Sequence, residues 1–130
     1  MTVNEHIKLV RRHRKMTSKE LAGDARVSPA EISLIERQMR APRIDTLQRI
    51  AAALEVSVSY LISEANSGVP LELALAKESL QIFLRKSNLN AKEASKLRKI
   101  AGRSSAPQST KGWRDLVENL AEYHQSSRHT

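Results

Sequence analysis

The chain contains no cysteine, and only four of its 130 residues are aromatic. Without cysteine there is no disulfide, no thiolate nucleophile and no Cys-ligated zinc site. The sequence also has no apolar run of about 18 residues, the length of a membrane span. Charged residues begin at Glu5, which is not the pattern of a signal peptide. We therefore expect a soluble, cytoplasmic protein that does not associate with membranes.

Positive charge is what the sequence has in excess. Lys and Arg number 22 against 14 Asp and Glu, which gives a net charge of +8 at pH 7. Both halves contribute, because residues 1–64 carry 11 basic and 8 acidic residues, and residues 65–130 carry 11 and 6. A basic balance favours a polyanionic partner, with nucleic acid before an acidic membrane.

Apolar residues at helical spacing predict five short helices in residues 1–64, a compact all-α domain. Two of these helices begin with capping boxes eleven residues apart, Thr17 with Glu20 and Ser28 with Glu31. Pro29 follows the second cap at the first helical position, where its missing N–H costs no hydrogen bond. Two capped helices joined by a short turn indicate a helix-turn-helix arrangement.

The stretch from Met16 to Ile62 resembles the Cro/CI-type (XRE) family of bacterial and phage regulators. The matching residues are Thr17, Glu20-Leu21-Ala22, Val27-Ser28, Ile32-Ser33, Glu36-Arg37, Pro42, Thr46-Leu47, Ile50 to Leu54 and Val56-Ser57. The resemblance covers about residues 5–62 and implies a lambda-repressor-like domain that binds double-stranded DNA. Arg26 departs from the family's turn glycine, and a left-handed backbone there would cost about 1–2 kcal/mol. Arg43 replaces a capping serine.

The resemblance also implies which residues meet DNA. The start of the second capped helix faces base edges through Ser28, Pro29, Ala30, Ser33 and Leu34. We expect phosphate contacts from the surrounding basic and hydroxyl side chains, namely Arg11, Arg14, Thr17, Ser18, Lys19, Arg37, Arg40 and Arg43. For Arg11 and Arg14 the alternative is a helix face turned away from DNA. Few of the base-facing residues can form bidentate pairs worth about 1–3 kcal/mol each. Phosphate contacts are therefore expected to dominate affinity, with specificity from methyl contacts and DNA shape.

The second half predicts a separate helical domain, residues 71–130, after a linker at 65–70. Helices are expected at 71–87 and 90–101, followed by a loop from Gly102 to Thr110 and a last helix. About 60 residues bury little apolar surface by themselves, so we expect this domain to dimerise. The predicted dimer contacts are Leu75, Ile82, Phe83, Trp113, Leu116 and Leu120. The alternative for Trp113 is an ordinary core aromatic.

The C-terminal half more faintly resembles a repressor subgroup that includes the radiation- and desiccation-response repressor of the Deinococcus lineage. The shared features are a basic loop ending at Pro107 and a tryptophan, Trp113, six residues later. In that subgroup a separate metallopeptidase cuts the C-terminal domain, which abolishes dimerisation and releases the operator in a DNA damage response. The resemblance places the cut in this chain at Ala101, Gly102, Arg103 and Ser104.

Catalysis and metal binding find little support in the sequence. His6 and His13 share a helix face, but no carboxylate completes a metal site, so we expect surface histidines. No nucleophile elbow or phosphate-binding glycine loop is present. We therefore expect no enzyme and no cofactor.

The sequence predicts a dimeric transcriptional repressor at a palindromic operator. The first alternative is an antitoxin whose C-terminal helices bind a toxin. The second is a nucleoid protein that binds DNA without sequence preference.

Overall fold

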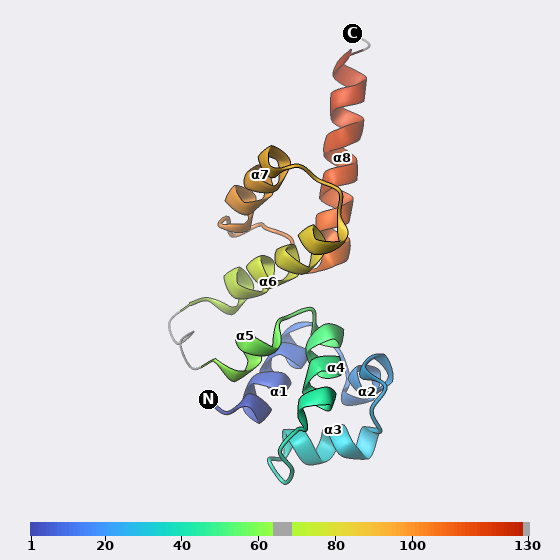
Figure 1. The fold of residues 1–130 in the computed structure, drawn as a ribbon, viewed down its shortest axis with the longest axis vertical. Helices are drawn as coiled ribbons and strands as arrows, with labels where there is room; N and C mark the ends of the chain where they lie inside the picture. Colours follow the sequence, from blue (N-terminus) through green and yellow to red (C-terminus); the bar gives the residue numbers. More distant parts are fainter. Residues whose placement is uncertain (64–68, 129–130) are drawn as a thin grey trace. The chain divides into compact units, whose positions relative to one another are not determined.

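The structure is a computed structural model that describes residues 1–63 and 69–128, with side chains for residues up to 120. All regular secondary structure in this part of the chain is helical (Figure 1), which confirms the predicted all-α fold class. The helices are α1 Val3–His13, α2 Ser18–Ala25, α3 Pro29–Glu36, α4 Ile44–Leu54, α5 Val58–Ile62, α6 Leu71–Lys86, α7 Ala91–Ala101 and α8 Thr110–Arg128. None of these described helices is both long and apolar enough to cross a lipid bilayer.

The chain forms two compact units, Met1–Gly68 and Val69–Thr130, and each is described by itself. Most of the predicted linker, residues 65–68, lies outside the described residues. Val69 and Pro70 are described, and Pro70 precedes the first turn of α6. The assignment of separate tasks to the two units remains a prediction.

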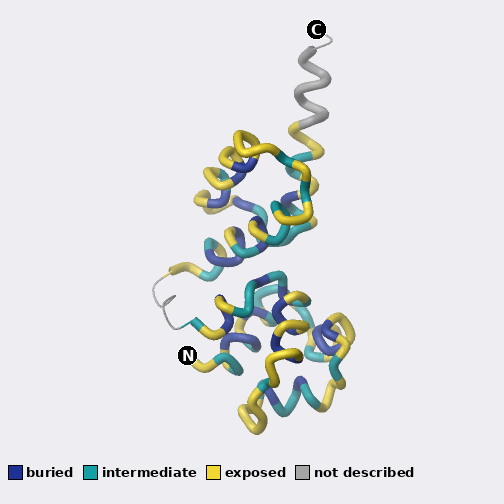
Figure 2. The backbone as a smooth tube through the Cα atoms, viewed as in Figure 1, coloured by how far each residue is buried: buried dark blue, intermediate teal, exposed yellow. Residues whose placement is uncertain are grey.

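The N-terminal unit holds α1 to α5, in agreement with the five short helices predicted there. In it, α2 packs against α3 and α4, while α1 packs against α3, α4 and α5. Figure 2 shows the buried side of each helix turned toward the others. The fully buried large side chains are Ile7, Val10, Leu21, Ile32, Ile35, Ile50, Leu54 and Leu61. This apolar core fixes the orientation of α3, whose opposite side faces solvent.

His6 is part of this core region, which corrects the expectation of two surface histidines. Its side chain is buried, and its Nδ1 lies 3.1 Å from the backbone oxygen of Leu61. The imidazole also packs against Tyr60 with a centroid distance of 4.4 Å. His6 therefore links α1 to α5 because its ring finds both an apolar neighbour and a polar partner.

The C-terminal unit packs α6 against both α7 and α8. Its core is the set of buried residues Ala76, Leu80, Leu97, Ala101, Ala106 and Trp113. Trp113 was predicted at a dimer interface, and the structure corrects this, because its side chain is 0% exposed within its own unit. A side chain enclosed in this way has no surface left for a partner to cover.

Candidate nucleic-acid interface

The turn between α2 and α3 is set by a left-handed residue. Arg26 ends α2 with φ 58° and ψ 45°, the conformation that glycine adopts most easily. The N–H of Val27 returns to the backbone oxygen of Ala22 over 2.9 Å, which closes the C-terminal end of α2. The left-handed backbone suspected at Arg26 is thus present. It brings the chain directly to Ser28, the N-cap of α3.

The five residues predicted to face bases lie together on the outer side of α3. Ser28, Pro29 and Ala30 are exposed, and Ser33 and Leu34 are partly exposed. The Ser28 hydroxyl oxygen accepts the N–H of Glu31 over 3.1 Å, so what remains for recognition is chiefly its O–H as a donor. The face therefore offers methyl and aliphatic groups with two hydroxyls.

The carboxylate of Glu31 has a different role from the one expected. A capping box would direct it back to the Ser28 N–H, but the carboxylate instead forms a short ion pair with Arg40. Arg40 follows α3 and can reach back to its first turn. Because its side chain is still 54% exposed, Arg40 keeps surface for a phosphate while it neutralises the only carboxylate of that turn.

The loop after α3 is held in place from α1. The amide of Asn4 donates to the backbone oxygens of Ile35 and Arg40, over 2.7 and 2.9 Å. These two bonds tie the last turn of α3 and the following loop to the start of α1. No local sequence pattern indicates this positioning role of Asn4, because its partners are more than thirty positions away.

An open groove of about 590 Å³ lies between the starts of α3 and α4. Four arginines line it: Arg26, Arg40, Arg43 and Arg49. Arg49 lies 3.8 Å from the carboxylate of Asp45 and donates to the backbone oxygen of Arg26 over 3.2 Å. Arg26 and Arg49 are not among the phosphate contacts predicted from the sequence. Arg26 could have been found from its position in the turn, whereas Arg49 joins the groove only through packing of α4.

The remaining predicted phosphate contacts lie at the start of α2 and at the end of α3. Thr17 forms the expected capping box, accepting the Glu20 N–H over 3.0 Å and donating its own N–H to the Glu20 carboxylate over 3.1 Å. Ser18, the first residue of α2, is partly exposed, and Lys19 is exposed. Arg37 is exposed at the end of α3. A helix N-terminus with such neighbours attracts anions.

Arg11 and Arg14 are corrected from phosphate contacts to internal partners. Arg11 is 12% exposed, its Nε lies 2.6 Å from the carboxylate of Glu36, and it also donates to the backbone oxygen of Met16 over 2.7 Å. Arg14 is 11% exposed and donates to the backbone oxygen of Leu54 over 2.6 Å. Burial lowers the pKa of Arg14, and the nearby carboxylate of Glu55 opposes that shift. Both guanidinium groups bind inside the unit and leave little surface for DNA.

The predicted dimer residues divide into two groups in the C-terminal unit. Leu75 is fully buried but does not belong to the core cluster around Trp113, and its part in a dimer contact stays a prediction. Ile82, Phe83 and Leu116 are partly exposed, and Leu120 is 40% exposed. These four keep surface that a partner could bury.

The predicted cleavage segment begins inside the core and ends at the surface. Ala101 is buried at the end of α7, whereas Gly102, Arg103 and Ser104 are exposed. The N–H of Arg103 donates to the backbone oxygen of Ile100 over 2.9 Å. Within the described residues, no group of three or more His, Asp or Glu side chains could hold a metal ion.

Comparisons of the chain with protein families, with known proteins and with solved structures each give a match. A family model described as helix-turn-helix matches residues 7–61. The immunity repressor protein of Bacillus phage phi105 is 33% identical over 98 residues, covering 68% of this chain and 68% of that protein. Among solved structures, a chain of the SinR protein/SinI protein complex aligns with 27% identity and a TM-score of 0.49, covering 75% of this chain and 92% of that one.

Proposed function

The chain belongs to the helix-turn-helix family of Cro/CI-type DNA-binding regulators, and we propose that it is a repressor. In this proposal it binds as a homodimer to a palindromic operator that overlaps a promoter. Repression is supported by the 33% identity to a phage immunity repressor over more than two thirds of both chains. The proposal also specifies that the chain dimerises, that its operator is palindromic and which residues contact the DNA.

One observation carries the proposal: the exposed side of α3 is bordered by arginines that still have surface for DNA. Ser33 and Leu34 form the middle of that side, and Arg37, Arg40 and Arg43 lie beyond it, all three exposed. With α3 in the major groove, these arginines would meet the phosphates that flank it.

Direct readout by α3 relies on few groups. Ala30 and Leu34 can contact thymine methyl groups, and Ser33 can form one hydrogen bond to a base edge. Pro29 has no N–H to donate, and the Ser28 oxygen already caps the helix. Specificity therefore depends on methyl contacts and on the shape of the operator, while phosphate contacts supply most of the affinity.

Dimerisation would place two copies of α3 one helical turn of DNA apart. The C-terminal unit supplies the candidate surface through Ile82, Phe83, Leu116 and Leu120, which are the predicted seam residues with exposed area. A dimer of this kind recognises an inverted repeat because the two-fold axis of the protein coincides with that of the DNA.

The test is a selection of genomic fragments with the purified full chain at about 150 mM salt, where non-specific phosphate binding is weak. The proposal expects an inverted repeat with half-sites about one helical turn apart. A Leu34→Ala variant should change or lose that site preference. Equal recovery of all fragments, unchanged in Leu34→Ala, would favour the nucleoid protein. No recovery above background, with dimers absent unless a toxin is added, would favour the antitoxin.

Control by a separate metallopeptidase is the second part of the proposal. It is supported by the exposed Gly102, Arg103 and Ser104 immediately after the buried end of α7. A cut there separates α6 and α7 from Trp113 and α8, and so removes the centre of the C-terminal core. After DNA damage, the mass of the recovered chain should show fragments ending between Ala101 and Ser104. Induction of target genes with only intact chain present would contradict this route.

A further inference from the structure

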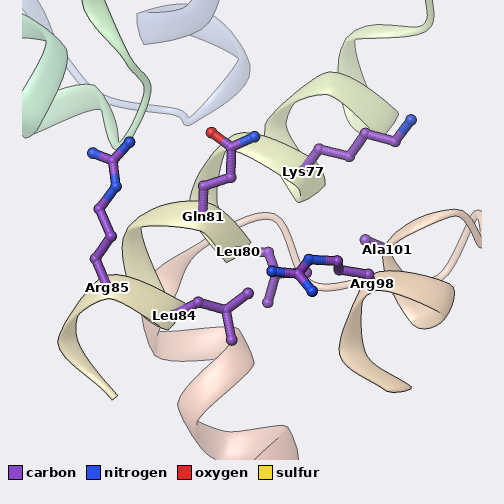
Figure 3. A pocket seen from close by; sticks show the side chains of 7 residues that line it. All are labelled: Lys77, Leu80, Gln81, Leu84, Arg85, Arg98 and Ala101. Atoms are coloured by element: carbon purple, nitrogen blue, oxygen red, sulfur yellow. The ribbon is translucent and has the colours of Figure 1, made fainter. Parts of the chain in front are cut away.

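A groove of about 530 Å³ lies between α6 and α7 in the C-terminal unit (Figure 3). Its floor is apolar and consists of Leu80 and Leu84 from α6 and Ala101 from α7. Leu80 and Ala101 belong to the buried core, and Leu84 packs against that core while staying partly exposed. The floor is thus formed by well-packed helices and not by a loop.

Three cations surround this floor. Lys77 and Arg85 come from α6 and Arg98 from α7, and all three are exposed. In Figure 3, Arg98 extends from α7 toward Leu80, whereas Lys77 and Arg85 project outward from α6. None of the seven described residues that line the groove is acidic. Among the described residues, no carboxylate pairs with any of these three cations.

The surrounding sequence adds to this positive charge. From Arg85 to Arg114 the chain has nine basic residues and a single acidic one, Glu93. The Glu93 carboxylate accepts a hydrogen bond from the Asn90 side chain over 2.9 Å. This segment by itself carries a net charge of +8, the same as the whole chain. Such a field attracts an acidic partner from a distance.

The spacing of the groove's charges matches a helix. Lys77 and Arg85 are eight residues apart on one side of α6, which at 1.5 Å per residue is about 12 Å along the axis. Two carboxylates two turns apart on a partner helix have nearly the same separation. Apolar side chains between them would cover Leu80 and Leu84, as in helix-in-groove recognition. We propose that this groove docks an acidic amphipathic helix of a partner protein.

Two other occupants fit the groove less well. DNA would meet the cations, but its sugar-phosphate backbone has little to gain from an apolar floor. A second copy of the chain offers the exposed carboxylates of α8, Asp115 and Glu118, but Lys111 and Arg114 lie beside them and cancel their charge. An acidic amphipathic helix satisfies both the charges and the floor. The proposal does not depend on the DNA contacts of α3.

The experiment is a display selection of random peptides, about 16 residues long, on the immobilised full chain. Excess duplex DNA is present to occupy the DNA-binding surface. Selected peptides are then synthesised, and their affinity is measured by fluorescence anisotropy. We expect acidic amphipathic helices with carboxylates about two turns apart. The groove variant K77E/R85E/R98E should bind them about tenfold more weakly or worse, because three attractive charge pairs become repulsive.

A matched control reverses three exposed cations on another side of α7. K92E/K96E/K99E changes the net charge by the same amount, and it should keep nearly all of the peptide affinity because these residues do not line the groove. All six positions are exposed, so both variants should keep the wild-type far-UV circular dichroism and melting temperature. If the groove variant does not fold, the single Arg98→Gln variant replaces it.

Several results would overturn the proposal. One is a selection that returns no acidic amphipathic sequences, or peptides that bind both triple variants equally. Another is conversion of dimers to monomers by the groove variant, which would mean that a second copy covers the groove. A third is loss of affinity for non-operator duplex DNA in the groove variant alone, with peptide binding unchanged, which would assign the groove to nucleic acid.

Discussion

The indole N–H of Trp113 donates to the hydroxyl of Ser79 over 3.0 Å, and both side chains are completely buried. The hydroxyl of Ser79 in turn donates to the backbone oxygen of Ala76 over 3.2 Å. Every polar group of this short chain of hydrogen bonds has a partner. The pair joins α8 to α6 and lets a tryptophan occupy the centre of a small core.

Replacing Ser79 with alanine leaves the indole N–H buried without its acceptor. An unsatisfied buried donor costs about 1–3 kcal/mol, so Ser79→Ala should lower the free energy of unfolding of the C-terminal unit by that amount. Urea unfolding can be followed through the fluorescence of Trp113, the only tryptophan. Ser95→Ala, at an exposed position of α7, is the control and should change the free energy by less than about 0.5 kcal/mol. Equal effects of the two would contradict the assigned hydrogen bond.

Replacing Arg26 with glycine should stabilise the N-terminal unit. Arg26 has a left-handed backbone with φ 58°, which costs a residue with a Cβ atom about 1–2 kcal/mol. The expected gain in the free energy of unfolding is about 1 kcal/mol, because glycine also loses more chain entropy on folding. Thermal unfolding by far-UV circular dichroism measures it. Arg26→Ala keeps the Cβ atom and should show no such gain, and a similar gain in both variants would refute the backbone explanation.

Arg43 should show opposite effects on stability and on DNA affinity. Arg43 is the N-cap of α4, and within the described residues its side chain makes no cap hydrogen bond. Arg43→Ser supplies that cap, so stability should rise by about 0.5–2 kcal/mol. If Arg43 contacts a phosphate, Arg43→Ser should also bind the operator more weakly. A plot of log affinity against log salt concentration should then become less steep by about one unit of slope. Arg43→Ala should lose the same affinity without the gain in stability, and unchanged salt dependence in both would remove Arg43 from the phosphate contacts.

The ion pair between Arg11 and Glu36 should behave as a buried structural pair. The two side chains are 12% and 7% exposed, and removing one partner strands the other charge, which costs about 3–5 kcal/mol. Glu36→Ala should therefore destabilise the N-terminal unit strongly. The double variant Arg11→Met/Glu36→Leu should recover much of the loss, because no charge is left unpaired. Urea unfolding of the single and double variants tests this, and additive losses would contradict it.

A charge at Ile82 should separate the proposed dimer. Ile82 is partly exposed on α6. In a two-fold dimer each protomer would bury one glutamate at this position, and neither carboxylate would have a partner. Sedimentation of Ile82→Glu should give monomers, and operator binding should weaken accordingly. Lys86→Glu, at an exposed position of the same helix, should remain dimeric. A dimer that survives in folded Ile82→Glu would move the interface elsewhere.

Local rules were sufficient to predict the helices and their starts. Thr17 and Ser28 cap helices through their side chains, as their spacing to Glu20 and Glu31 predicts, and Ser57 and Asn90 do the same. Capping depends on atoms within three residues of each other, so a sequence contains nearly all of the information. The all-α class follows in the same way from apolar residues at helical spacing.

The tertiary structure determined which partners the individual charged and aromatic side chains bind and how far they are exposed. Arg11 and Arg37 are both predicted phosphate contacts, yet Arg11 binds Glu36 inside the unit while Arg37 is exposed. Glu31 lies in a capping-box pattern, yet its carboxylate forms an ion pair with Arg40. Trp113 has the spacing of an interface residue, yet its indole finds Ser79. A long side chain binds the partner that packing brings within reach. The three partners in these examples, Glu36, Arg40 and Ser79, all lie more than eight residues away, where local spacing gives no indication of them.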